Sequence, residues 1–301
     1  MLRSLIAVLV LAAALGASPV EAQGGGSTRL VILGTGTPIA DPSRSGPGVA
    51  IVVGSRSYLV DAGPGIVRRA ASAFELGFDA LHASSLTRVF ITHLHSDHTL
   101  GLPDLMFTPW QNGREAPLEV WGPPGIRRMT DKIAEAWVED VYMRLFGLES
   151  VTRRDYRAVP HEVEGGRIYD DGVVVVDAIP VEHLTWPHAF GYRFRTPDRT
   201  IVVSGDARPS PSLAEACDGC DILVHEVYSE QFFGDHPNQA YHRAAHTSAA
   251  ELAELATRAR PGLLVLYHQL LGGATDDELE AEMRAAGYRG AVVSARDLDV
   301  F

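Results

Sequence analysis

The strongest constraint on the fold is a dense run of metal-binding side chains directly after a short apolar segment. Residues 89–92 read Val-Phe-Ile-Thr, which predicts a buried strand, and His93, His95, Asp97 and His98 follow it. Imidazoles and carboxylates are ligands that zinc and similar divalent metals prefer. Four such groups on so tight a loop cannot all bind one ion and leave a position open for a substrate. Because the first two histidines point one way and the last two groups another, the run predicts two metal ions side by side.

Three more candidate ligands stand later in the chain, each just after a predicted strand. The ends of strands are where the ligands of an α/β site gather. A single histidine in such a place is more often an ordinary surface or core residue. Five histidines and two aspartates that all follow apolar runs are hard to produce by chance, so the sequence predicts a dinuclear centre. The later candidates are His183, Asp206 and His268, after the predicted strands 173–179, 200–203 and 263–266.

The rest of the chain alternates between predicted strands and helices, without a short repeat or a low-complexity segment. This pattern predicts a single, sheet-rich α/β domain whose helices cover the sheets. The other predicted strands are residues 30–33, 49–53, 58–60, 118–121, 189–195 and 221–225. The predicted helices are residues 66–77, 99–106, 126–142, 248–258 and 276–286.

The first residues carry the pattern of a secretory signal. Arg3 supplies a positive start, residues 5–15 are all apolar, and small residues precede a cleavage site after Ala22. The apolar run is shorter than the ~20 residues of a membrane span, so cleavage is favoured over an uncleaved anchor. The sequence predicts a signal peptide over residues 1–22, a flexible mature N-terminus over residues 23–28 and one folded domain over residues 29–301. We therefore expect a periplasmic or secreted protein with no stable membrane anchor after cleavage.

The chain has two cysteines, Cys217 and Cys220, in a C-x-x-C arrangement. Without a second such pair, a four-cysteine zinc site is excluded. In an oxidising compartment the two would form a local disulfide. Two free, buried cysteines are the alternative, because free cysteine is often buried. The sequence leaves both interpretations open.

The overall charge argues against a general nucleic-acid binder. The chain has 26 Lys and Arg against 38 Asp and Glu, a formal net charge of −12. A protein that holds nucleic acid needs positive charge facing the phosphates. With 46% hydrophobic residues the chain has ample material for a core, which excludes disorder of the whole chain.

The metal-binding run and its distant partners resemble the metallo-β-lactamase superfamily, and most closely its RNase Z and RNase Z-like arylsulfatase branch. The resemblance covers nearly the whole chain after residue 22. It implies a four-layer αββα sandwich, of class α/β (α+β), with the metals at one edge of the sheets, so that residues 29–301 are a hydrolase domain of this fold. Besides His183 and His268, the matching segments are residues 33–38, 61–63, 93–98, 122–125, 190–194, 204–209, 225–226 and 246–249.

The resemblance also implies how the ligands divide between two divalent ions, with zinc favoured. Zinc β-lactamases lack the bridging aspartate of this branch, so antibiotic hydrolysis is disfavoured. A bridging aspartate at Asp206 is instead similar to the phosphodiesterase, sulfatase and lactonase members of the superfamily. The implied ligands are His93, His95 and His183 for one ion, Asp97, His98 and His268 for the second, and Asp206 as the bridge.

Such a centre implies a hydrolase in which a hydroxide shared by two metals attacks phosphorus, sulfur or a carbonyl carbon. Asp97 would orient or deprotonate the attacking water. His246 resembles the RNase Z histidine that protonates the leaving oxygen. The alternative for His246 is a plain position at a helix start, beside the capping residues Thr247 and Ser248.

Several other residues are candidates for supporting roles. Asp61 and Glu226 would each orient a ligand histidine, although a turn would also explain Asp61. Aromatic side chains near the motifs line either the pocket or the core. Trp186 is the best pocket candidate because it lies three residues after His183. The other aromatic candidates are Phe107, Trp110, Tyr228, Phe232 and Phe233.

The substrate is predicted by what the chain lacks. RNase Z grips tRNA with a long flexible arm, whereas residues 121–157 here are helical in pattern and not glycine-rich. Their one basic cluster, residues 153–157, is equally explained by a solvated turn. We expect a small-molecule phosphodiester or aryl sulfate ester as substrate, and nucleic acid is disfavoured. An RNase Z-like endoribonuclease of tRNA, a lactone or acyl hydrolase and a non-catalytic metal-binding protein remain alternatives, and a homodimer stays open.

Overall fold

The computed structural model describes residues 27–149, 155–233 and 239–301. The predicted signal peptide, residues 23–26 and the arginines at 153 and 154 of the basic cluster lie outside these residues. Thr28 is buried, and its backbone N–H donates to Asp198 Oδ2 at 3.0 Å. Among the described residues, none of the helices has the length and apolar character that crossing a membrane requires.

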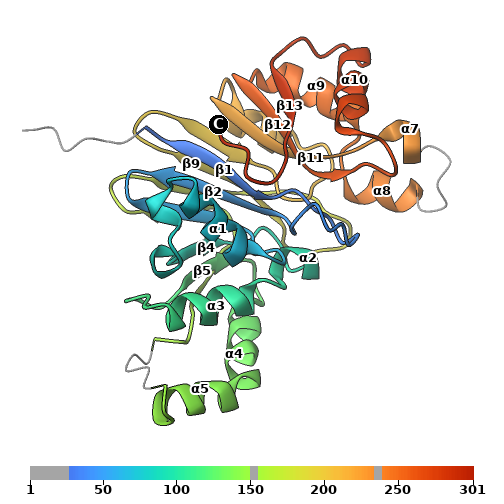
Figure 1. The fold of residues 1–301 in the computed structure, drawn as a ribbon. Coiled ribbons are helices and arrows are strands. Elements are labelled where there is room, and N and C mark those ends of the chain that lie inside the picture. Colours follow the sequence, from blue (N-terminus) through green and yellow to red (C-terminus); the bar gives the residue numbers. More distant parts are fainter. Residues whose placement is uncertain (1–26, 150–154, 234–238) are drawn as a thin grey trace, which may run out of the picture.

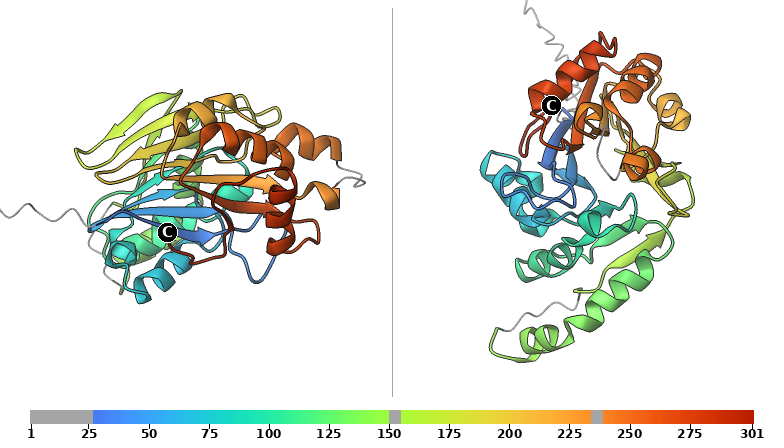
Figure 2. Two further views of the ribbon diagram at one scale, coloured as in Figure 1. Left: turned by 90° about the horizontal axis from the view of Figure 1, so that it is seen from above. Right: turned by 90° about the vertical axis from the view of Figure 1, so that its right-hand side faces the viewer.

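Two sheets lie face to face, with helices on both outer sides (Figures 1 and 2). This arrangement confirms the predicted αββα sandwich. The first sheet has the order β1 (Arg29–Gly34), β2 (Gly48–Val53), β3 (Arg56–Val60), β4 (Arg88–Phe90), β5 (Glu119–Gly122) and β6 (Val159–Glu162). The second has the order β13 (Val292–Ser294), β12 (Leu263–Leu270), β11 (Ile222–Tyr228), β10 (Thr200–Val203), β9 (Phe190–Arg195), β8 (Val175–Pro180) and β7 (Gly166–Asp170).

The helices fall into two sets that follow the order of the chain. The first set accompanies the first sheet, with α4 and α5 at the lower end of the molecule in Figure 1. It comprises α1 (Ile66–Glu75), η1 (Asp79–Leu81), η2 (Ala83–Ser85), α2 (Ser96–Thr99), α3 (Leu102–Gln111), α4 (Ile126–Ala136) and α5 (Val138–Phe146). The second comprises α6 (Pro211–Cys217), α7 (Glu230–Phe233), α8 (Gln239–Ala245), α9 (Ala249–Ala259) and α10 (Asp276–Ala285).

Alternate residues of one strand face different layers, as the two-residue period of a strand requires. Leu30 and Ile32 of β1 pack between the sheets, whereas Val31 and Leu33 pack toward the helices of the first layer. The residues of β12 alternate in the same way between the inter-sheet core and the core under α9 and α10. Because both faces are buried, these strands read as continuous apolar runs in the sequence.

The predicted helix over residues 126–142 is wrong in one respect. The chain breaks at Trp137, whose φ of −101° ends α4, and α5 begins at the next residue. Three strands were not predicted. β6 and β7 have polar, partly exposed sequences, and β13 is only three residues long, so none of them shows a clear apolar alternation.

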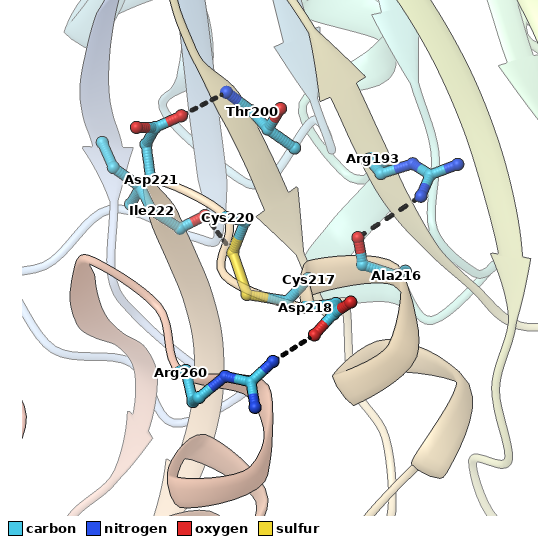
Figure 3. The surroundings of a disulfide bond; sticks show 9 residues. All are labelled: Arg193, Thr200, Ala216, Cys217, Asp218, Cys220, Asp221, Ile222 and Arg260. Carbon is cyan, nitrogen blue, oxygen red and sulfur yellow. Dashed lines mark hydrogen bonds and ion pairs between the residues drawn. A yellow bond between two sulfur atoms is a disulfide. The ribbon is translucent and has the colours of Figure 1, made fainter.

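Cys217 and Cys220 form a disulfide between the end of α6 and the residues just before β11, so the alternative of two free thiols is wrong (Figure 3). Both cysteines are buried. Within the turn that they close, Asp218 pairs with Arg260, which follows α9, at 2.6 Å. The disulfide therefore fixes the junction between α6, β11 and α9.

Candidate metal centre

Eight polar side chains from both sheets and their connecting turns meet in one cluster. Most of them are buried, and they fall into three overlapping groups in which the ligand atoms lie within 4.8 Å of one another. The structure thus brings together all seven predicted ligands, and it places His246 beside them. The groups are His93, His95, His183 and Asp206; Asp97, His98 and His268; and Asp206, His246 and His268.

The first group is a ring of imidazoles. His95 Nδ1 lies 3.0 Å from His93 Nε2 and 3.1 Å from His183 Nε2. Asp206 Oδ2 lies 3.9 Å from His93 Nε2. Burial lowers the pKa of His93 well below its ordinary value, which keeps this imidazole neutral and able to offer a lone pair to a cation.

The second group is built around two carboxylates. Asp97 Oδ2 lies 3.2 Å from His268 Nε2 and 3.5 Å from His98 Nε2. Asp206 contributes Oδ1 at 3.3 Å from His98 Nε2 and Oδ2 at 3.5 Å from His268 Nε2. Asp206 therefore lies between the two groups, at the position predicted for a bridging ligand.

Asp61 holds the metal-binding run in place through hydrogen bonds on the side away from the cluster. Its Oδ2 accepts a hydrogen bond from His98 Nδ1 at 2.8 Å, and its Oδ1 accepts from Thr92 N at 2.8 Å. The Thr92 hydroxyl lies 3.0 Å from both Asp61 oxygens and 3.0 Å from His93 Nδ1. Because Asp61 engages Nδ1 of His98, Nε2 is the nitrogen that faces the cluster, where a bound cation would take the place of its proton.

His183 is set by the backbone in the same way. Its Nδ1 donates to the carbonyl oxygen of Ala245 at 2.8 Å, which leaves Nε2 unprotonated toward the cluster. His98 Nε2 and Asp206 Oδ1 are buried and make no well-formed hydrogen bond within the described part of the chain. Burial opposes charge at His98, yet Asp206 and Asp61 raise its pKa well above the ordinary value. Converging lone pairs and carboxylates that favour positive charge are the donor set of a divalent-metal site.

Two backbone positions let these side chains converge. His268 has a φ of +45° and is the extra residue at an irregularity in β12, where Tyr267 pairs with Glu226 and Gln269 with Val227. Such bulges redirect a side chain at the cost of local strain. Gly205, with a φ of +62°, precedes Asp206, and a Cβ there would lie 2.8 Å from Thr92 Cβ. The turn after β10 therefore needs glycine to pack against the metal-binding run.

His246 forms a pair with Glu226. Its Nδ1 lies 3.2 Å from Glu226 Oε1, which also accepts hydrogen bonds from the backbone of Thr247 and Ala207. Burial lowers the pKa of His246 to about 4, and burial together with the charge of Asp206 raises the pKa of Glu226. The histidine that Glu226 contacts is His246, which lies in the group with Asp206 and His268 and is not one of the seven predicted ligands. Glu226 follows His225 in the sequence, and this position does not indicate a contact with His246.

The helix start near His246 has its own capping residue. Ser248 Oγ accepts from Glu251 N at 3.2 Å, and Glu251 reaches back to Ser248 N at 3.0 Å. This capping box begins α9 without the side chain of His246. The plain role at a helix start therefore belongs to Ser248, and His246 faces the cluster.

Trp186 lies at the site, as its position after His183 indicates. Its indole Nε1 donates to His95 Nε2 at 2.8 Å. Because an indole N–H is only a donor, a neutral His95 then carries its own proton on Nδ1, toward the cluster. The other aromatic candidates divide differently: Phe107, Trp110 and Tyr228 are buried, and the side chains of Phe232 and Phe233 lie outside the described part of the structure.

A cavity of about 650 Å³ opens beside Asp97. Its walls are residues 37–42 and 44–46 of the turn between β1 and β2, Pro64 and Gly65 after β3, and the segment around α2. Thr37, Pro38 and Ser96 belong to the segments that carry the family resemblance, but the sequence predicted no cavity from them. The glycines and prolines of residues 37–46 indicate a turn, but nothing in them shows that it lies against the metal-binding run.

Comparison with known proteins agrees with the fold. A sequence model described as "Beta-lactamase superfamily domain" matches residues 56–269. Ribonuclease Z from Mycobacterium marinum is 32% identical over 280 residues, covering 89% of this chain and 96% of the relative. Among solved structures, the metallo-β-lactamase fold protein YhfI from Bacillus subtilis has a TM-score of 0.70 at 19% identity, covering 92% of this chain and 100% of that one. The short form of human tRNase Z has a TM-score of 0.66 at 24% identity, covering 91% and 98%.

The match of a family model to most of the chain and the identity to ribonuclease Z along nearly its full length are independent of the geometry above. The matched range, residues 56–269, contains all seven predicted ligands and His246. The chain therefore belongs to the β-lactamase superfamily, as a metallo-β-lactamase-fold hydrolase related to ribonuclease Z.

Proposed function

We propose that the protein is an exported phosphodiesterase that uses two divalent ions, with zinc favoured, and that aryl sulfate esters are its second substrate class. The observation that carries this proposal is the position of Asp206 between the two ligand groups. A carboxylate that serves both groups suits a two-metal ester hydrolase. Relatives that are named as ribonucleases favour the phosphodiester, because RNA cleavage breaks this bond.

In this proposal each ion has three ligands of its own and shares one. Bound ions would polarise the ester, neutralise growing negative charge and make water more acidic. Asp97 borders the cavity, so its carboxylate is in position to accept a proton from the attacking water. The proposed ligands are His93, His95 and His183 for one ion, Asp97, His98 and His268 for the other, and Asp206 for both.

His246 and Glu226 would supply the proton for the leaving oxygen. His246 Nδ1 lies 3.2 Å from Glu226 Oε1, and both side chains are buried. The two groups therefore titrate as a coupled pair. Burial and the charge of Asp206 raise the pKa of Glu226, which favours a proton shared by the pair. Transfer of that proton through His246 would convert a poor leaving group into an alcohol.

The Cys217–Cys220 disulfide supports export. Disulfides persist in oxidising compartments such as the periplasm and are rare where thiols are kept reduced. The acidic balance of the chain supports a small substrate over a polyanionic one. We therefore propose that the protein acts in the periplasm or outside the cell on a small ester. We also propose that it forms a homodimer.

A second candidate function is endonucleolytic processing of tRNA, which is favoured by the 32% identity to ribonuclease Z over 89% of the chain. It requires cytoplasmic location and a surface that holds RNA. The two candidates differ in substrate size and charge, and not in chemistry at the metal centre.

The test uses the mature chain, residues 23–301, loaded with zinc. We expect two zinc ions per chain and hydrolysis of bis(p-nitrophenyl) phosphate, with slower hydrolysis of p-nitrophenyl sulfate. Asp206→Asn serves as the inactive control. Efficient cleavage of precursor tRNA with no activity on the small esters would favour the second candidate, and two bound metals with no hydrolysis at all would contradict both.

A further inference from the structure

We infer that the cavity beside Asp97 binds an uncharged aryl or alkyl group of the ester substrate. This inference rests on the proposed function and extends it from the reacting group to the rest of the substrate. The cavity volume of about 650 Å³ is ample for a substituted phenyl ring next to the ester.

The first argument is the apolar character of the walls. Ile39 and Leu100 line the cavity and remain 67% and 62% exposed. Pro38, Ala40 and Pro42 add to the same apolar surface. Large apolar side chains gathered in a hollow beside reactive groups are typical of a surface that a ligand covers. An apolar group of the substrate would gain by removing both itself and these side chains from water.

The second argument is that the walls are held in place without a ligand. Gly101, next to Leu100, packs so closely on the turn after β3 that a Cβ there would lie 2.3 Å from Gly63 O. On the opposite wall, Ser45 N donates to Asp297 Oδ2 at 2.7 Å. A cavity that is formed in advance costs less ordering when it binds.

The third argument is charge. Arg44 is the one cationic side chain among the described residues that line the cavity, and it is already neutralised. Its Nη2 donates to both carboxylate oxygens of Asp276, at 2.8 and 2.9 Å, and its Nη1 donates to Gln269 Oε1 at 3.0 Å. Asp41 adds negative charge to the same walls, whereas the charge of Asp97 would be balanced by the ion that it binds. A second phosphate of a polyanion would therefore find no counter-charge in this cavity.

Together these features select an ester with one anionic centre and an apolar substituent. The anionic centre would meet the metal centre, and the substituent would lie over Ile39 and Leu100. Nucleic acid combines polar sugars with repeated phosphates, so it fits this cavity poorly. The inference thereby separates aryl or alkyl diesters from dinucleotides, which share the same reacting group.

The test measures binding to the zinc-loaded full chain by calorimetry, with three monoanionic diesters as probes: diphenyl phosphate, dimethyl phosphate and uridylyl-uridine. We expect diphenyl phosphate to bind about tenfold or more tightly than either other probe, since burying part of a phenyl ring has an effect of this order. Leu100→Ser and Ile39→Ser should each remove most of this preference and raise the KM for bis(p-nitrophenyl) phosphate. Leu76→Ser is the matched control, because Leu76 is also 62% exposed but lies at the end of α1, outside the cavity.

Equal binding of the three probes, or a preference that survives in both variants, would overturn the inference even if the enzyme hydrolyses the esters. A preference that depends on Leu100 and Ile39 in a protein without hydrolytic activity would uphold the cavity and refute the proposed function. Tighter binding of uridylyl-uridine than of diphenyl phosphate would overturn the inference in favour of a nucleic-acid substrate.

Discussion

Asp206 touches both ligand groups, so its single charge acts on the whole centre. Asp206→Asn keeps the size of the side chain but removes the charge that two cations would share. We expect metal affinity to fall by more than about 100-fold, beyond the loss typical of an outer-shell residue, and turnover to be nearly abolished. Metal content after gel filtration, with circular dichroism as the control for folding, measures the effect. Full metal content together with wild-type activity in this variant would remove Asp206 from the site.

His246 and Glu226 allow a prediction about the leaving group. His246→Ala and Glu226→Gln should keep both metals and slow hydrolysis of alkyl esters by about 10²–10⁴-fold, the usual effect of a general acid. Esters of p-nitrophenol should slow much less, because this alcohol leaves without a proton. The measurement is kcat against leaving-group pKa for both variants. Loss of metal, or an equal loss of rate for all leaving groups, would give His246 a structural role.

His98 and His183 each donate a hydrogen bond to an oxygen atom, of Asp61 and of Ala245 respectively. His95 instead accepts a hydrogen bond from the indole N–H of Trp186. While the indole occupies His95 Nε2, a neutral His95 holds a proton on Nδ1, and metal binding has to displace it. Trp186→Phe should therefore tighten zinc binding, on the order of tenfold, because the proton of neutral His95 can then move to Nε2 without facing the indole N–H. Titration against a chelator measures this, with the half-exposed Trp137→Phe as control. Weaker binding in Trp186→Phe would mean that the indole supports the ligand.

At the level of single residues, the sequence predicts more of the site than of its surroundings. The seven candidate ligands were found because each follows an apolar strand, and the structure brings them together. The contact of Glu226 with His246 and the left-handed backbone of His268 depend on packing between distant segments. No local pattern indicates either feature.

At the level of elements, Asp171 joins the two sheets. The hydroxyl of Tyr58, on β3 of the first sheet, donates to Asp171 Oδ2 at 2.7 Å, and the backbone N–H groups of Val173 and Val174 donate to Oδ1. Burial opposes ionisation, but these hydrogen bonds lower the pKa of Asp171 to about 2. A carboxyl whose pKa falls on folding stabilises the fold above its unfolded pKa of about 3.9.

Asp171→Asn should therefore be less stable than wild type at pH 7, by about 1 kcal/mol once screening by solvent is allowed for. The stabilisation is fully present above about pH 4 and is lost as the pH falls toward 2, so the difference between the two proteins should shrink over this range. Urea unfolding of both proteins at several pH values measures it. A difference that stays constant from pH 7 to pH 2 would show that the charge of Asp171 does not matter.

Elements with two buried faces were predictable, and elements with exposed faces were not. β1, β2 and β12 are continuous apolar runs because they are covered on both sides. β6 has a partly exposed, mostly polar sequence, so its pairing with β5 decides its structure. The break between α4 and α5 at Trp137 could not be predicted either, because no glycine or proline stands there.

At the level of the whole molecule, the αββα sandwich follows from two sheets that each need cover on their outer face. Resemblance to a known superfamily supplied the layer order, and alternation of strands and helices supplied only the class. The cavity beside Asp97 could not be predicted from the sequence. Its wall depends on Arg44, which is held by Asp276 from a part of the chain more than two hundred residues away.

The central claim is that seven side chains bind a pair of divalent ions around Asp206. Anomalous diffraction at the zinc edge, from crystals of the zinc-loaded chain, tests it most directly. We predict two peaks about 3.5–4 Å apart, the spacing of two-metal hydrolases, with Asp206 in contact with both. A single peak, or peaks away from the imidazoles of residues 93–98, would contradict the claim.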